Sequence, residues 1–168
     1  MKQTILILCF LAVSFCGCNS RSSVQAETLV LPESDVYIGG YGEELFTWDK
    51  PYRWVHWDDS RLCSTCLLKQ YYLWDELIDS LGTDSIDYIF ILEPREDYSE
   101  KTLSSVLNEN YFSHPIIIDR SGFFDIRNGI KTVSGSIDIL TDRTGKIVLV
   151  GDLRNDYKFY QRVKRKIS

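Results

Sequence analysis

The chain has 168 residues, of which 44% are hydrophobic and 26% charged, a composition typical of one packed globular domain and not of a disordered protein. Its formal net charge is −5, and an acidic surface repels the phosphate backbone of nucleic acids. These values exclude nucleic acid as an expected partner.

The first 17 residues have the pattern of a signal peptide. Lys2 supplies the positive charge, and an apolar run over residues 5–15 follows that is too short to span a bilayer comfortably. Polar residues begin directly after Cys18, in the stretch 19–23. An ordinary secretory leader is the alternative, but no A-x-A-like cleavage site precedes these polar residues.

The segment Phe15-Cys16-Gly17-Cys18 resembles a lipobox, the cleavage and acylation site of bacterial lipoproteins. This resemblance implies cleavage after Gly17 and lipid attachment to Cys18. Cys16 is the rival acylation site, but Phe15 would then occupy the cleavage position that a small residue normally fills. We therefore expect a signal peptide over 1–17, a lipidated cysteine and tether over 18–45, and a globular domain over 46–168. Asn19 in place of Asp after Cys18 implies transport to the outer membrane, with the domain in the cell envelope and facing the periplasm.

Strand and helix patterns alternate along the expected domain. The predicted strands cover 52–57, 86–92, 116–118, 137–140 and 146–150. The predicted helices cover 64–81, 99–109 and 155–167, and residues 121–129 are expected to form a short helix or a loop. Strands separated by helices favour parallel pairing with right-handed crossovers. The turn 142–145 should join the last two strands as a hairpin, and Asn155 should cap the last helix. The prediction is an α/β fold in which a mixed sheet carries helices on both faces.

Two cysteines lie where the first predicted strand meets the first predicted helix, in Cys63-Ser64-Thr65-Cys66. Unpaired backbone N–H groups at a helix N-terminus favour the thiolate form of Cys63. Cys66, one turn further along, can reach the same sulfur and should be shielded inside the helix. A thiolate with a second thiol one turn away is the minimum apparatus for thiol–disulfide exchange.

This order of strand, CxxC and helix resembles the thioredoxin fold, and specifically the membrane-tethered periplasmic redoxins of the TlpA type. The segments 115–122 and 137–148 are similar to that family's third-strand segment and closing hairpin, so the resemblance covers about residues 50–168. The layout is also similar to that of short lipoproteins from Bacteroidetes. The resemblance implies a thiol–disulfide oxidoreductase in which Cys63 is the exposed attacking cysteine and Cys66 the buried resolving one. Its expected partners are envelope protein disulfides or a redox partner protein.

The sequence departs from this family at the site itself. Leu62, Ser64 and Thr65 stand where the family usually has Trp before the first cysteine and Pro between the two. The position of the family's cis-proline, which contacts substrate, falls on Ser136. This last departure favours a binding or scaffold module that keeps the fold without turnover. A peroxidase-like antioxidant redoxin is a third, weaker alternative.

No cofactor or metal is expected. A zinc site built on Cys63 and Cys66 would need two further ligands, and only His56 and His114 are available, without His/Cys spacing around them. His56, on an alternating strand, is interpreted as a packed or hydrogen-bonded residue. A purely structural disulfide between the two cysteines remains an alternative to a catalytic one.

Overall fold

The structure, a computed structural model, describes residues 22–32, 37–38, 49–95, 98–112, 114 and 116–168. The predicted signal peptide and the predicted lipidation site Cys18 lie outside these residues.

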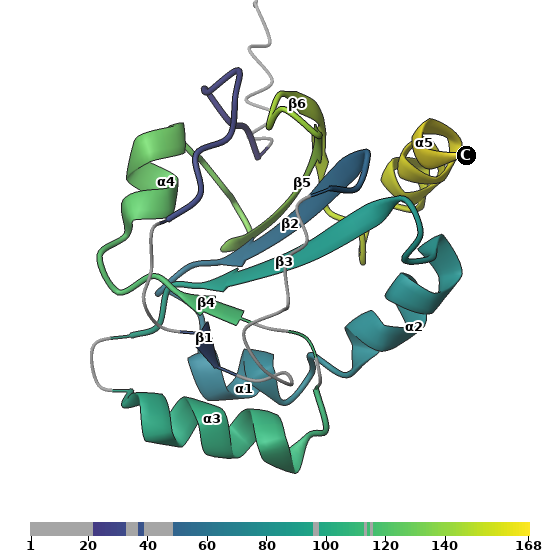
Figure 1. The fold of residues 1–168 in the computed structure, drawn as a ribbon. Coiled ribbons are helices and arrows are strands. Elements are labelled where there is room, and N and C mark those ends of the chain that lie inside the picture. Colours follow the sequence, from purple (N-terminus) through teal and green to yellow (C-terminus); the bar gives the residue numbers. More distant parts are fainter. Residues whose placement is uncertain (1–21, 33–36, 39–48, 96–97, 113, 115) are drawn as a thin grey trace, which may run out of the picture.

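A six-stranded mixed sheet forms the centre of the molecule, with the strand order β1-β4-β3-β2-β5-β6 (Figure 1). Its strands are β1 (Tyr37–Ile38), β2 (Tyr52–Asp58), β3 (Ile86–Leu92), β4 (Ile116–Ile118), β5 (Ser136–Asp142) and β6 (Ile147–Gly151). β2, β3 and β4 run parallel, whereas β5 pairs antiparallel with both β2 and β6. The prediction of a mixed sheet with a closing hairpin is therefore confirmed.

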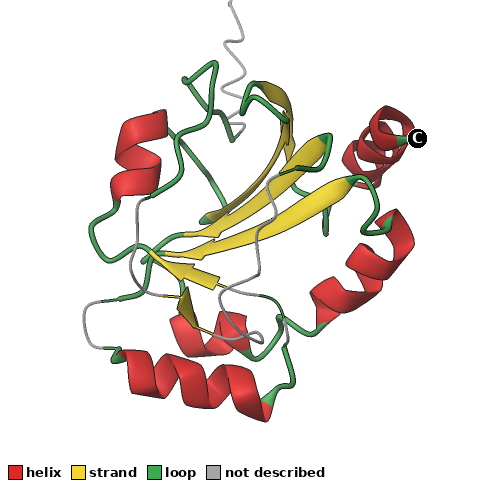
Figure 2. Cartoon of the chain, viewed as in Figure 1, coloured by secondary structure: helices red, strands yellow, loops and turns green. Residues whose placement is uncertain are grey.

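Helices cover both faces of the sheet, as predicted (Figure 2). They are α1 (Ser64–Leu68), α2 (Leu73–Leu81), α3 (Glu100–Glu109), α4 (Phe123–Asn128) and α5 (Tyr157–Ile167). One hydrophobic cluster joins the sheet to α1, α2, α3 and α5, and a second joins its other face to α4. All seven residues of β3 are buried because this central strand lies between the two clusters.

The helix predicted over 64–81 is two helices, α1 and α2, joined by a turn over 69–72. In this turn the hydrogen bonds tighten to i→i+3, for example from the Trp74 N–H to the Tyr71 carbonyl. Tyr71 is fully buried, and its hydroxyl donates to Asp58 on β2 at 2.6 Å. This long-range bond holds the turn against the sheet, and no local pattern in the sequence predicts it.

The sequence predicts Asn155 as the N-cap of α5, but in the structure the N-cap is Asp156. The Asp156 carboxylate accepts the backbone N–H groups of Lys158 and Phe159 at the start of the helix.

Residues 22–32, which the sequence assigns to the tether, lie against the domain. The side chain of Asn128, at the end of α4, exchanges two hydrogen bonds of 2.8 Å with the backbone of Val30. Val24, Leu29 and Leu31 pack against the hydrophobic cluster beneath α4. This part of the expected tether thus belongs to the globular body and covers the face of the sheet that α4 leaves open (Figure 1).

Candidate functional site

Cys63 and Cys66 form a disulfide directly after β2, with their Cα atoms 5.2 Å apart. Cys63 is the N-cap residue of α1, so the pair lies at the junction of strand and helix that the sequence predicts. We call residues 59–66, from the end of β2 to the second cysteine, the cysteine turn.

The two cysteine residues differ in exposure, and the difference is opposite to the prediction. Ser64 and Leu68 are four residues apart on α1 and are 1% and 0% exposed, so this side of the helix faces the domain. Cys66 lies midway between them in sequence and is exposed, whereas Cys63 is half-buried. The prediction of a shielded Cys66 and an exposed Cys63 is therefore wrong, because the buried Ser64 fixes the rotation of α1.

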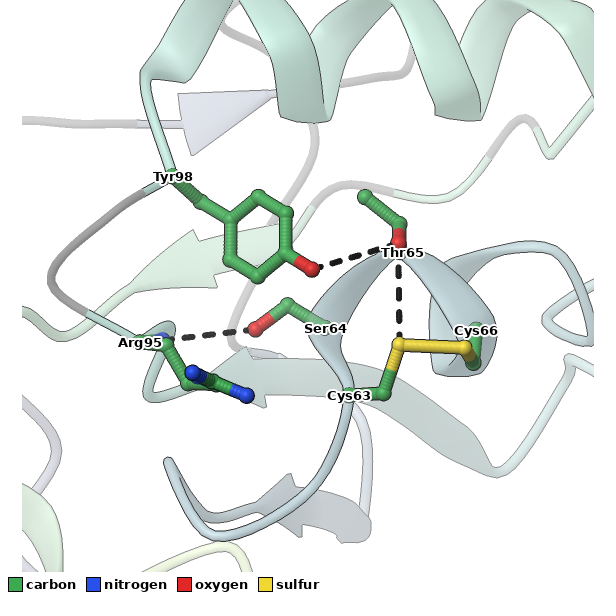
Figure 3. The surroundings of a disulfide bond; sticks show 6 residues. All are labelled: Cys63, Ser64, Thr65, Cys66, Arg95 and Tyr98. Carbon is green, nitrogen blue, oxygen red and sulfur yellow. Dashed lines mark hydrogen bonds between the residues drawn. A yellow bond between two sulfur atoms is a disulfide. The ribbon is translucent and has the colours of Figure 1, made fainter.

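Polar groups of Thr65, Ser64, Tyr98 and Arg95 lie near the disulfide (Figure 3). The Thr65 hydroxyl lies 3.7 Å from the Cys63 sulfur and 3.5 Å from the Tyr98 hydroxyl. The Ser64 hydroxyl accepts the backbone N–H of Arg95 at 3.4 Å. The loop after β3 thus contacts the cysteine turn through both residues between the cysteines.

The loop that precedes β5 lies against the other end of the cysteine turn. The Asp59 N–H donates to the Gly135 carbonyl at 2.8 Å, and the Arg61 guanidinium donates to the Thr132 carbonyl at 3.1 Å. Gly135 has a φ of +82°, and a Cβ atom there would come within 2.8 Å of the Leu62 side chain. Only glycine therefore allows the loop to approach Leu62, the neighbour of Cys63, this closely.

Ser136, the predicted substrate contact, begins β5 directly after this loop and pairs with Asp58 across the sheet. Its hydroxyl donates inward to Asp58 at 2.5 Å. The described residues contain no cis peptide bond, so Ser136 does not reproduce the geometry of a cis-proline. A contact between Ser136 and a substrate remains a prediction.

A buried ion cluster lies behind the cysteine turn, and the sequence reasoning missed it. His56 Nδ1 is 2.8 Å from Asp138 of β5, and His56 Nε2 is 3.0 Å from Asp58. The three side chains are no more than about 3% exposed. The available signal was an aspartate within the apolar run of the fourth predicted strand, Ile137-Asp138-Ile139-Leu140. The interpretation of His56 as a hydrogen-bonded residue is confirmed.

The charges of this cluster follow from its contacts. Burial alone would lower the pKa of His56, but the carboxylates of Asp58 and Asp138 outweigh it and raise that pKa to about 9. Burial would likewise raise the pKa of Asp58, but the His56 charge and the hydrogen bonds from His56, Ser136 and Tyr71 lower it to about 2. Burial dominates at Asp138 and raises its pKa, despite its contacts with His56 and the Leu153 N–H. The cluster therefore holds an imidazolium at neutral pH, between the carboxyl groups of Asp58 and Asp138.

Within the part of the chain that the structure describes, no group of three or more His, Cys, Asp or Glu side chains could hold a metal ion. Among the same residues, no helix has the length and apolar character needed to cross a bilayer.

No protein-family model and no curated protein matches the sequence. Solved structures do match the fold. A thioredoxin-like superfamily protein is 13% identical with a TM-score of 0.64, covering 84% of this chain and 96% of its own. A thiol-disulfide isomerase from Corynebacterium glutamicum is 14% identical with a TM-score of 0.62 and the same two coverages. The exposed lipoprotein thioredoxin Etrx1 from Streptococcus pneumoniae strain TIGR4 is 18% identical with a TM-score of 0.54, covering 78% of this chain and 98% of its own. The domain thus has a thioredoxin-like fold, as predicted.

Proposed function

We propose that this protein is a thiol–disulfide oxidoreductase that works through Cys63 and Cys66, in the manner of a TlpA-type redoxin. The observation that carries the proposal is the accessible disulfide at the start of α1, next to the loop that leads into β5. A disulfide that includes an exposed cysteine residue can exchange with a thiol of a second protein. Two proteins of similar fold are described as a thiol-disulfide isomerase and as a lipoprotein thioredoxin, and these descriptions agree with the proposed chemistry.

Turnover with a model disulfide tests the proposal. The wild-type protein should catalyse the reduction of insulin by dithiothreitol, and Cys63→Ser and Cys66→Ser should each lose this activity. Cys18→Ser is the matched control, because it removes a cysteine outside the pair and should leave the rate unchanged. An equal rate for the wild type and both variants of the pair would reject the activity.

We place the protein in the cell envelope, lipid-anchored through Cys18 to the outer membrane and facing the periplasm, as in lipoproteins of Bacteroidetes. The lipobox resemblance around Gly17 and Cys18 supports this placement. Its partners would then be envelope protein disulfides or a redox partner protein. Cys18→Ala should release the protein into the soluble fraction or stall its processing, whereas Cys16→Ala, at the rival site, should leave it in the membrane fraction. Processing of Cys18→Ala to the same mature length as wild type, together with equal membrane association, would reject the anchor.

A non-catalytic binding module is the second candidate, and the geometry of Ser136 favours it. This residue follows a trans peptide bond and directs its hydroxyl to Asp58, so the loop lacks the proline of catalytic relatives. The insulin assay separates the two candidates, because a binding module would leave the uncatalysed rate unchanged.

A further inference from the structure

The last helix, α5, concentrates positive charge on an otherwise acidic chain. It contains no Asp or Glu, and its five cations are Lys158, Arg162, Lys164, Arg165 and Lys166. Of the 19 Lys and Arg residues of the chain, the other 14 stand against 24 Asp and Glu, so the chain outside α5 has a net charge of −10. A negatively charged surface would therefore attract α5 and repel the rest of the protein.

The cations of α5 are available to a partner. All five are exposed, and none forms an ion pair with a carboxylate of the described residues. Lys158, Arg162 and Arg165 are spaced at i, i+4 and i+7, which places them on one face of the helix. Phe159 and Val163 are fully buried and hold a separate face against the domain. Favourable placement near the helix C-terminus does not explain this row of charge, because Lys158 lies in the first turn, where a cation is unfavourable.

The basic helix and the N-terminal segment 22–32 both contact β6, the edge strand of the sheet (Figure 1). At the start of β6, the Ile147 N–H donates to the Glu27 carbonyl at 2.9 Å. At its end, Gly151 lies so close to α5 that a Cβ atom there would come within 2.5 Å of the Phe159 ring. The segment that follows the proposed lipidation site and the basic helix thus lie along the same edge of the domain.

The proposed lipid is also attached close to this body. Ser23 exchanges backbone hydrogen bonds of 2.8 and 2.9 Å with Lys131, and the Ser22 hydroxyl lies 3.3 Å from that of Thr132. Cys18 precedes Ser22 by only four positions, a span of at most about 14 Å. A lipid on Cys18 would therefore keep the body at the membrane surface, with one of its faces turned toward the headgroups.

We infer that α5 docks on anionic headgroups of the membrane that carries the anchor, and that this contact determines which face of the domain turns toward the bilayer. The inference rests on the proposed anchor at Cys18 and is independent of the proposed exchange activity. Basic side chains near an anionic bilayer are attracted to it, while the acidic remainder of the protein turns away. Tyr157 is 73% exposed and stacks on Tyr160. Since tyrosine is enriched at membrane–water interfaces, a lipid surface fits α5 better than an acidic protein does.

Lysine labelling on vesicles tests the docking. The full chain, purified from the membrane fraction, is reconstituted in vesicles of phosphatidylcholine alone or with about one-third phosphatidylglycerol. It then receives a short pulse of an acetylating reagent, and mass spectrometry measures the acetylation of Lys158, Lys164 and Lys166. We expect severalfold slower acetylation on the anionic vesicles only, and no difference in about 1 M sodium chloride, where the Debye length is about 3 Å. Lys101, exposed on α3, is the internal control and should react equally on both vesicles.

Matched variants separate the helix from total charge. The test variant is Lys158→Gln/Arg162→Gln/Arg165→Gln, and the control, at exposed positions elsewhere, is Lys69→Gln/Arg127→Gln/Arg143→Gln. Only the test variant should lose the protection of Lys164 and Lys166, and it should reduce insulin at the wild-type rate in solution. Equal acetylation of wild-type α5 on the two vesicles, or equal protection in the two variants, would overturn the inference and favour an acidic protein as the partner.

Flotation with the neutral vesicles measures the anchor separately. A wild-type chain that does not float with them would contradict lipid attachment at Cys18, and an inactive chain in the insulin assay would contradict the exchange activity. The labelling difference between neutral and anionic vesicles depends on neither result, so it decides the docking of α5 alone.

Discussion

The buried ion cluster includes His56 and Asp58 of β2, and the cysteine turn follows this strand directly, yet the two regions are built in opposite ways. The cysteine turn is one short segment of the chain, and its disulfide joins a half-buried and an exposed position three residues apart. The ion cluster joins His56 to Asp138 across 82 residues, through the register of β2 and β5, and is closed to solvent. The first region can therefore change its covalent state with little effect on the fold, whereas the second cannot change its charge without a large cost.

Removing the cation from the ion cluster should give the largest effect. His56→Ala leaves Asp58 and Asp138 buried without their partner, and we expect a loss of about 3–5 kcal/mol in the free energy of unfolding, measured by urea denaturation. His114→Ala is the matched control, because His114 is partly exposed and its contact with Asp75 is 3.4 Å. This second variant should lose less than about 1 kcal/mol. Equal losses in the two variants would show that the buried ion cluster stabilises the fold no more than the partly exposed contact of His114 does.

The pH dependence of stability should report the same charge. The pKa of His56 is raised from 6.5 to about 9, so its contribution is complete below pH 6.5 and is lost as the pH rises through 9. This loss amounts to about 3 kcal/mol. The pKa of Asp58 is lowered to about 2, so its contribution is lost only as the pH falls toward 2. Denaturation of the wild type and of His56→Gln between pH 6 and 10 measures the difference, and parallel curves would contradict the assignment.

The loop contact at Gly135 connects the cysteine turn to β5. Gly135→Ala should cost about 2 kcal/mol, because the residue has a positive φ and the new Cβ would meet Leu62. In a Leu62→Ala background the same substitution should cost clearly less, since the clash is then removed and only the backbone strain remains. Thermal denaturation of the four proteins in this cycle gives the coupling, and purely additive effects would exclude the contact.

Reduction of the disulfide should have the smallest effect on stability. The ring that the bond closes spans only four residues, so its contribution to the free energy of unfolding should be at most about 2 kcal/mol. Urea denaturation with and without dithiothreitol measures it. A loss comparable to that of His56→Ala would indicate that the disulfide is structural.

The sheet could be predicted from the sequence because its strands are apolar runs bounded by turn residues, as in 86–92, which coincides with β3. The break between α1 and α2 could not, since it depends on the bond from Tyr71 to Asp58 on a neighbouring strand.

The position of the cysteine pair was equally predictable, because it depends on local order alone. The exposure of its members was not, because a serine gives no sign of being buried, and it is the buried Ser64 that turns Cys66 outward. The contact between His56 and Asp138 could not be predicted, because it depends on the register in which β2 pairs with β5, and no local pattern in the sequence gives that register.

The reduction potential of the Cys63–Cys66 pair tests most directly whether this disulfide exchanges with thiols of other proteins or is purely structural. It can be measured by equilibrating the full chain with glutathione or dithiothreitol buffers and quantifying the reduced thiols by alkylation and mass spectrometry. We predict a value above about −300 mV, within the range of disulfides that exchange with cellular thiols. A value below about −300 mV would mark a structural bond and would contradict the proposed oxidoreductase activity.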